Sequence, residues 1–201
     1  LNIYSYSPQY NAASLNSYSS FGLNETADIL LSGFGLNDSG GKLKINHPVS
    51  VSSNGEKLAV TDRFNNRILI WNSIPNQKTA PDIVIGQKSF DTHNSGNGLD
   101  ELDFPGQVII TPDAKLLVAD SDNDRVLVWT NFPQTSGQTA DYAIPITNYV
   151  SMNNSWPWGV WSDGNKTIVT ATVSGTILIW NSFPGSNLSL IHISEPTRRL
   201  S

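Results

Sequence analysis

The chain has 201 residues, and its 12 Lys or Arg against 17 Asp or Glu give a formal net charge of −5. An acidic chain has no overall basic field to attract phosphate backbones, so a nucleic acid is a disfavoured partner. Cysteine is absent, which excludes disulfides, thiol catalysis and cysteine-ligated zinc from this sequence. The sequence contains no apolar run of roughly eighteen residues, the length that would predict a membrane-spanning helix.

The first predicted element is a short run that contains Tyr4 and ends at a proline four positions later. The same pairing of an aromatic residue with a later proline recurs at Trp71, Trp129 and Trp180. A long repeat of this kind is typical of a modular array. We expect the three tryptophans to lie in the core between neighbouring units.

Residues 9–26 are a Ser-, Asn- and Tyr-rich insertion after this first run. Long loops on a rigid repeat are frequent binding elements, and a plain surface loop is the alternative interpretation. An apolar run at 27–31 follows and is predicted to be a strand. The two runs belong to a partial first unit over residues 1–46.

The unit 47–103 shows the complete pattern. It opens with His47-Pro48, passes an Asn-Gly turn at 54–55, and continues through apolar runs at 57–62, 68–71 and 81–86. Asn-Gly supplies the positive φ that tight hairpin turns need. Four short β-branched runs separated by such turns predict four strands, and no stretch shows a sustained helical period.

The unit 104–155 repeats this order, and residues 156–186 contain the first three runs of another unit. Four strands in a unit of about fifty to sixty residues is the plan of a β-propeller blade. Stacked blades bury Ile, Val and Trp between them. The predicted fold is therefore all-β, an incomplete arc of about three four-stranded antiparallel propeller blades over residues 1–186.

Two units resemble a known repeat family. The segments His47-Pro-Val-Ser-Val, Asn54-Gly55, Leu58-Ala-Val-Thr-Asp62 and Asn66-Arg67-Ile-Leu-Ile together resemble an NHL repeat. The unit at 104–129 resembles it too, with Asp120, Asn123 and Arg125 as its Asp-x-x-Asn-x-Arg turn, whereas 171–176 lacks both the Asp and the Arg. The Trp-Asn-Ser-x-Pro extension resembles NHL-like propeller proteins of bacteria. The resemblance implies a six-bladed, TolB-like propeller that binds protein, nucleic acid or carbohydrate, and a minority of similar propellers are enzymes.

Both ends of the sequence differ from the repeat. Because the chain opens in the middle of a unit, we interpret it as a truncated fragment. Residues 188–198 have no counterpart in the other units and resemble a translated sequencing adapter. We therefore interpret residues 187–201 as a non-native or disordered tail.

An acidic stretch at 120–124 looks like the start of a calcium loop. A calcium loop of the EF-hand type needs Gly at its sixth position and Glu at its twelfth, where Arg125 and Asn131 stand instead. The matching turn at 62–67 favours a structural interpretation, in which the Asp accepts backbone N–H bonds and the Arg reaches a carboxylate or carbonyl of a neighbouring strand. We predict no metal and no cofactor.

The predicted binding surface is the channel face, where the first strands of the blades begin and the loops between second and third strands lie. Val49 is predicted to line the central channel there, and Arg63, Arg67 and Arg125 are a possible local basic patch. In the aromatic segment 156–161, we expect Trp156 and Trp161 to be buried between blades. The candidate ligand-binding residues on this face are Arg63, Phe64, Gln107, Ser121, Asp122 and Trp158.

These observations predict a non-catalytic ligand- or protein-binding scaffold, exported from a bacterium to the medium or cell envelope, with a protein or carbohydrate partner. No nucleophile–base pair is legible, so no catalytic residue is predicted. The alternative is a propeller enzyme of the lactonase, hydrolase or lyase kind, whose active-site residues lie partly in other blades. A third interpretation is a structural repeat of a larger surface protein. Open blade edges also predict self-association.

Overall fold

The computed structural model describes residues 27–31, 41–151 and 153–185. The first sheet contains β1 (Pro48–Ser53), β2 (Leu58–Asp62), β3 (Arg67–Trp71) and β4 (Ile83–Ile85). The second contains β5 (Val108–Ile110), β6 (Leu116–Asp120), β7 (Arg125–Trp129) and β8 (Tyr142–Pro145). The third contains β9 (Pro157–Ser162), β10 (Thr167–Ala171) and β11 (Thr176–Trp180). Short 3-10 turns are η1 (Arg63–Asn65), η2 (Ser121–Asn123) and η3 (Ile146–Tyr149).

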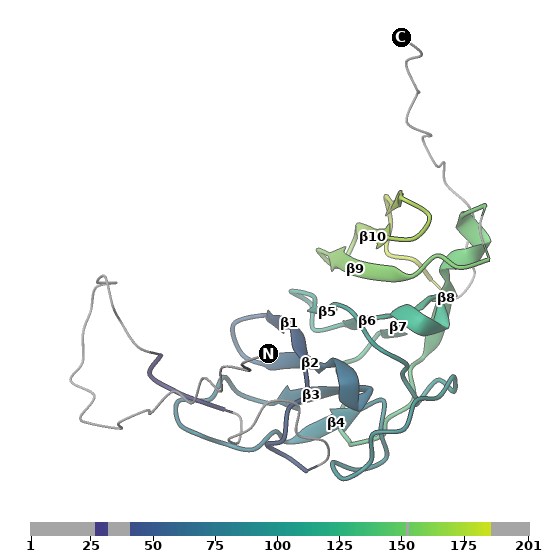
Figure 1. Ribbon diagram of the computed structural model, residues 1–201. Coiled ribbons are helices and arrows are strands. Elements are labelled where there is room, and N and C mark those ends of the chain that lie inside the picture. Colours follow the sequence, from purple (N-terminus) through teal and green to yellow (C-terminus); the bar gives the residue numbers. More distant parts are fainter. Residues whose placement is uncertain (1–26, 32–40, 152, 186–201) are drawn as a thin grey trace, which may run out of the picture.

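Each sheet is an antiparallel meander in which strands adjacent in sequence pair with one another. The three sheets are stacked like a fan, with β1, β5 and β9 along one side and β4 and β8 towards the other (Figure 1). This arrangement confirms the predicted fold class, an incomplete arc of a β-propeller. The predicted strand numbers of four, four and three are also found in the units that begin near 47, 104 and 156.

The hydrophobic core lies between the sheets. Ile68 and Ile70 of the first sheet pack with Val118, Leu127 and Trp129 of the second. The opposite face of the second sheet packs on the third through a cluster that includes Val126, Val128, Val169, Leu178 and Trp180. Alternate residues of a strand point to opposite faces, so a strand between two sheets must be apolar throughout.

The prediction for the three repeated tryptophans is confirmed. Trp71, Trp129 and Trp180 are only 1%, 0% and 7% exposed. The indole nitrogens of the first two donate to backbone carbonyls, Trp71 to Thr79 and Trp129 to Gln138. Burial of these two rings thus leaves neither indole nitrogen without a partner.

One face of the third sheet is open, and it shows that one prediction was wrong. Trp161, expected to be buried between blades, is 46% exposed, and Ile177 and Ile179 beside it are 64% and 50% exposed. The positions equivalent to these two isoleucines by strand register are fully buried in both other sheets, as Ile68, Ile70, Val126 and Val128. No described segment packs as a sheet against this face, which explains why Trp161 is exposed.

Several predictions fall outside the described residues. The run at 1–8, the insertion at 9–26 and the tail at 187–201 belong to this group. Residues 27–31, where a strand was predicted, are described but form no strand, because they make no backbone pairing with a described strand. In the part of the chain that the structure describes, no helix is long and apolar enough to cross a membrane.

Candidate ligand-binding site on the channel face

The Asp-x-x-Asn-x-Arg turn fixes the loop between the second and third strands of the first sheet. Asp62 and Arg67 are fully buried, and the Arg67 Nε lies 2.7 Å from the Asp62 Oδ2. The same carboxylate oxygen accepts from Asn65 Nδ2 at 2.9 Å, and Oδ1 accepts from the backbone N–H of Asn46 at 2.6 Å. A buried carboxylate with these three donors is well satisfied.

The second sheet repeats this network. Asp120 accepts from Arg125 Nε at 2.8 Å, from Asn123 Nδ2 at 2.9 Å and from the backbone N–H of Asp103 at 2.8 Å. Burial raises the pKa of Asp120 to about 6, and these hydrogen bonds and the positive charge of Arg125 lower it in part. The structural interpretation of the turn is therefore confirmed. The backbone N–H bonds come, however, from the segment that precedes the first strand and not from the turn itself.

The arginines of these two turns cannot form the basic patch that the sequence allowed. Arg67 donates to the carbonyls of Gly41 and Lys44 through Nη2. Arg125 donates to the carbonyls of Gly98 and Glu101 in the same way. Each guanidinium thus clamps the incoming loop and is not available to a ligand.

The three carboxylates of the acidic stretch point to different partners. Asp122 Oδ1 accepts from Trp156 Nε1 at 2.6 Å, whereas Asp120 pairs with Arg125. Asp124 Oδ1 accepts from the backbone N–H groups of Ser155 and Trp156, both at 2.7 Å. Among the described residues, no group of three His, Cys, Asp or Glu is arranged to hold a metal ion.

The residue after the turn's Asp reaches across to the next sheet. Arg63 Nη1 donates to the carbonyls of Phe104 at 2.8 Å and Pro105 at 3.1 Å. Ser121, at the same position one sheet later, donates to the carbonyl of Pro157 at 2.7 Å. Arg63 is 6% exposed and Ser121 is fully buried. These two predicted site residues therefore hold the sheets together and are not open to a ligand.

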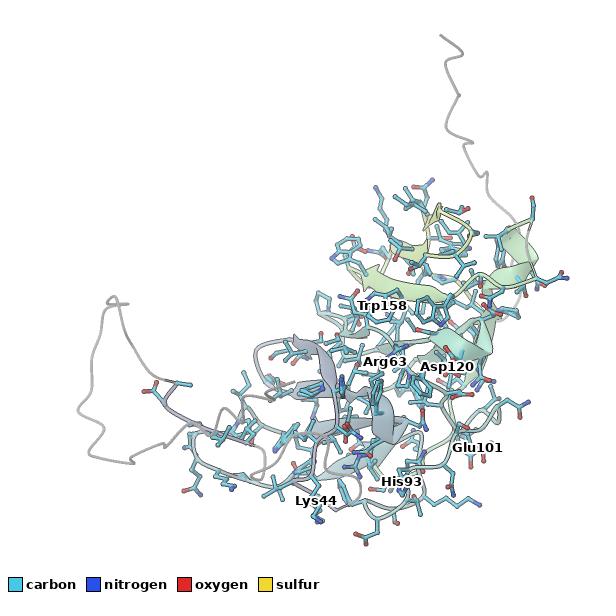
Figure 2. The ribbon with its side chains drawn as sticks, viewed as in Figure 1. Lys44, Arg63, His93, Glu101, Asp120 and Trp158 are labelled. Carbon is cyan, nitrogen blue, oxygen red and sulfur yellow. The ribbon has the colours of Figure 1, made fainter. Side chains whose placement is uncertain are left out.

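Three aromatic rings surround the buried Arg63, and two more extend the group through a chain of ring contacts that begins at one of them. We call these five the aromatic cluster: His47, Phe64, Phe104, Trp156 and Trp158. The guanidinium carbon lies 4.5 Å from the ring centre of Trp158, 5.3 Å from Phe104 and 5.6 Å from Trp156. Arg63 and Trp158 appear near one another in the middle of the fan (Figure 2). A desolvated cation beside ring faces stabilises such a cluster. Burial lowers the pKa of Arg63, and the charge of Asp122 raises it in part.

The backbone holds three of these rings in an unusual conformation. His47, Phe104 and Trp156 have φ values of 54°, 44° and 47°, and each precedes the proline that begins a blade. A left-handed conformation is costly for residues other than glycine, so the surroundings must hold it in place. Asn66 Oδ1 accepts from Phe104 N–H at 2.8 Å, which anchors one of the three directly.

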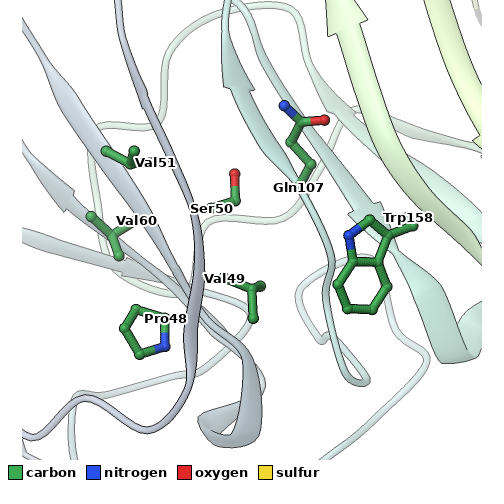
Figure 3. Close-up of a pocket in the computed structure, with 7 residues that line it drawn as sticks. All are labelled: Pro48, Val49, Ser50, Val51, Val60, Gln107 and Trp158. Carbon is green, nitrogen blue, oxygen red and sulfur yellow. The ribbon is translucent and has the colours of Figure 1, made fainter.

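A cavity of about 600 Å³ opens beside the cluster between the innermost strands. Its lining includes Val49, which the sequence placed in the channel, and Trp158 at the equivalent position of the third sheet. Gln107, one position further along its own sheet, lines it too, with Pro48, Ser50, Val51 and Val60 (Figure 3). Trp158 is 38% exposed there. Of the six candidate residues, Gln107 and Trp158 line the cavity. Phe64 is an exposed member of the aromatic cluster, and Asp122 is exposed beside it.

Gln107 is held at both ends. Its backbone N–H donates to the carbonyl of Trp158 at 2.9 Å, and its side-chain Oε1 accepts from the N–H of Val160 at 2.9 Å. The close approach of these strands requires glycine at position 106, where a Cβ would lie 2.6 Å from the Trp158 carbonyl oxygen. The sequence signal for this contact is the Gly106-Gln107 pair. The pair can be interpreted only once the position of the neighbouring sheet is known.

Two carboxylates, those of Asp103 and Asp122, lie near the cluster. The backbone N–H of Asp122 donates to the carbonyl of Asp103, so the two residues lie side by side. Burial raises the pKa of Asp103, and the negative charge of Asp122 raises it further. Since Arg63 is buried, the exposed part of this surface presents negative charge and ring surface.

Comparison with known proteins adds little to this picture. No protein-family model matches the chain, and no curated protein matches it. Among solved structures, the chain is similar to a catalytically inactive virginiamycin B lyase from Staphylococcus aureus with quinupristin, at 12% sequence identity and a TM-score of 0.39. The match covers 69% of this chain, which spans 42% of that protein's chain. The fold assignment therefore rests on the sheet topology and on the packing between sheets.

Proposed function

We propose that the chain is part of a non-catalytic binding scaffold, a propeller of the NHL type whose channel face holds a ligand or a protein. The observation that carries this proposal is Trp158, a large ring 38% exposed at a cavity and supported by a buried guanidinium 4.5 Å from its centre. Tryptophan and arginine are enriched among residues that dominate binding energy. A concave, mainly apolar surface with a few fixed polar groups is the usual form of a ligand site.

The composition of the cavity favours binding over catalysis. Its lining consists of Pro, Val, Ser, Gln and Trp side chains, and none of these pairs a nucleophile with a base. An enzyme of the lactonase, hydrolase or lyase kind would need acid, base or metal-binding groups at this mouth. Asp103 and Asp122 are not among the lining residues and lie on the side of the aromatic cluster.

The same surface argues against nucleic acid. Phosphate recognition depends on exposed Lys and Arg, whereas Arg63 and Arg67 are buried and Arg125 is engaged by carbonyls and Asp120. Export from a bacterium is proposed from the composition, which is low in charge and rich in Asn, Ser and Thr, and from the resemblance to bacterial propellers. Finding the protein in the envelope or culture medium of its source organism tests that part.

The binding proposal is tested with the full chain and two sets of probes, an array of soluble oligosaccharides and an array of random linear peptides. Trp158→Ala should abolish binding to any probe that the parent chain retains. Trp161→Ala removes another exposed tryptophan from the opposite face of the same strand and should change nothing. The proposal is wrong if every retained probe binds both variants equally well.

A further inference from the structure

The side chain of Gln107 carries two hydrogen-bond donors with a fixed direction. Its Oε1 is engaged by Val160 N–H at 2.9 Å, so the carboxamide cannot turn over without losing that bond. Its Nε2 hydrogens have no hydrogen-bond partner among the described residues. Gln107 lines the cavity (Figure 3), so these hydrogens can donate to an acceptor atom of a ligand there.

The other walls of the cavity have distinct chemistry. Trp158 supplies a ring face, and Pro48, Val49 and Val60 supply an apolar wall near β1. Ser50 Oγ accepts from Val108 N–H at 3.2 Å, which leaves its second lone pair and its own hydrogen for a ligand. The cavity thus offers ring surface, apolar surface, an amide donor and a hydroxyl within about 600 Å³.

An extended peptide does not fit this site well. Peptides that add to a sheet use unpaired backbone groups along a strand edge. Here the edges between inner strands are already bridged, because Ser50 and Ser52 accept from Val108 and Ile110, and Gln107 N–H donates to Trp158. Recognition must therefore come from side chains, which suits a small rigid ring.

An anionic ligand is also disfavoured. The chain has a formal net charge of −5, and the one arginine beside Trp158 is buried against backbone carbonyls. An anionic sugar or phosphate would find no cation in the cavity lining. The ligand class that matches carries no negative charge, has an apolar ring face, and carries both an amide-like acceptor and a small apolar group.

We propose that the cavity binds a 2-acetamido sugar, with the pyranose ring on Trp158, the acetamido carbonyl accepting from Gln107 Nε2 and its methyl group against Val49. The acetamido N–H then donates to Ser50 Oγ. This deepens the proposed function, on which it rests, by naming the ligand class of the same site. The cavity volume lies within the range of roughly 300–1,000 Å³ that small-ligand sites usually have.

The test compares three β-1,4-linked trisaccharides that differ at carbon 2. Tri-N-acetylchitotriose carries acetamido groups, cellotriose carries hydroxyls, and the fully deacetylated glucosamine trimer carries amines. Isothermal titration of the full chain should give binding of the acetylated trimer and at least roughly tenfold weaker binding of the other two, since each loses the amide acceptor and the methyl contact.

Two variants assign the contacts. Gln107→Glu keeps the acceptor for Val160 N–H and removes both donors, so affinity for the acetylated trimer should fall roughly tenfold. Trp158→Ala should weaken it by a similar factor, whereas Trp161→Ala should leave it unchanged. Unchanged melting temperatures show that the variants fold.

Equal affinity for all three trisaccharides, or insensitivity to Gln107→Glu, overturns the acetamido assignment. Absence of saccharide binding overturns it as well. In that case, a peptide from the array whose binding depends on Trp158 leaves the broader binding proposal standing. If neither a saccharide nor a peptide binds in a way that depends on Trp158, both proposals are refuted.

Discussion

Asp124 of the second sheet anchors the backbone of Trp156 in the third, its Oδ1 lying 2.7 Å from the Trp156 nitrogen. Asp124 has a φ of 54°, and the same oxygen also accepts from the N–H and the hydroxyl of Ser155. Asn66 does the same for Phe104 one sheet earlier. In each of the first two sheets, a residue with a left-handed backbone therefore lies between the turn and the third strand. Its side chain binds the backbone of the aromatic residue that precedes the next sheet.

Removing this anchor should destabilise the protein. Asp124→Ala loses three hydrogen bonds and places alanine at a positive φ, a conformation that alanine disfavours. The free energy of unfolding should therefore fall by about 2–4 kcal/mol. Asp124→Asn keeps the Oδ1 acceptor and tolerates this φ, and should stay near the parent value. Urea denaturation measures both. Equal losses in the two variants would contradict the role given to Oδ1.

Arg67 should not tolerate lysine. Lysine keeps the positive charge but cannot donate at once to Asp62 and to the carbonyls of Gly41 and Lys44. The buried carboxylate and carbonyls then lose donors, and we expect Arg67→Lys to cost about 2–4 kcal/mol. Lys166→Arg, on the exposed surface, is the control. An unchanged melting temperature in Arg67→Lys would show that charge alone holds the turn.

Asp120 should make stability depend on pH. Its pKa is about 6 in the fold against an ordinary value of 3.8, so the folded state binds this proton more tightly than the unfolded state does. The free energy of unfolding should therefore rise by about 1 kcal/mol as the pH falls from 7 to 5, and this gain is lost as the pH rises through 6.

The variant Asp120→Asn removes this titration. Its stability should change less between pH 7 and pH 5 than that of the parent chain, as measured by denaturation at each pH. Parallel pH profiles of the two proteins would rule Asp120 out as the source.

Gly106 should be needed for the spacing of the second and third sheets. A Cβ there would lie 2.6 Å from the Trp158 carbonyl oxygen, closer than real Cβ contacts. Gly106→Ala should cost about 1–3 kcal/mol through the forced shift, and it should also displace Trp158. Gly185→Ala, with nothing within 4 Å of the new Cβ, serves as the matched control. Thermal unfolding and tryptophan fluorescence provide the two readouts.

The open face of the third sheet should cause self-association, as the sequence predicted for open blade edges. Ile177 and Ile179 are 64% and 50% exposed, and apolar patches of this kind mark sites of association. Sedimentation velocity of the full chain should show species larger than a monomer that diminish in the double variant Ile177→Asp/Ile179→Asp. A monomer at all concentrations in the parent chain would exclude this contact.

The sequence was a good guide wherever local chemistry decides the structure. Turns such as Asn54-Gly55 and the repeated Asp-x-x-Asn-x-Arg pattern marked the hairpins, and the strand order followed from them. The buried state of Trp71 and Trp129 was also predictable, since a repeated large ring has to lie between sheets.

The sequence was a poor guide wherever contacts between sheets decide. Arg63 looked like an exposed binding residue, but carbonyls of the next sheet bury it. Trp161 looked like a core residue, but its exposure depends on whether another sheet packs against that face of the third sheet. The positive φ of Phe104 depends on Asn66, thirty-eight positions away, and no local pattern shows such a bond.

The two tryptophans of the aromatic cluster have a kinetic consequence. Since the Trp156 ring is held by its hydrogen bond to Asp122 and the Trp158 ring packs against Arg63, little side-chain freedom is left to lose when a ligand arrives. Binding should then resemble docking onto a preformed template, with fast association that is similar for related ligands. Differences in affinity among such ligands should appear mainly as differences in residence time.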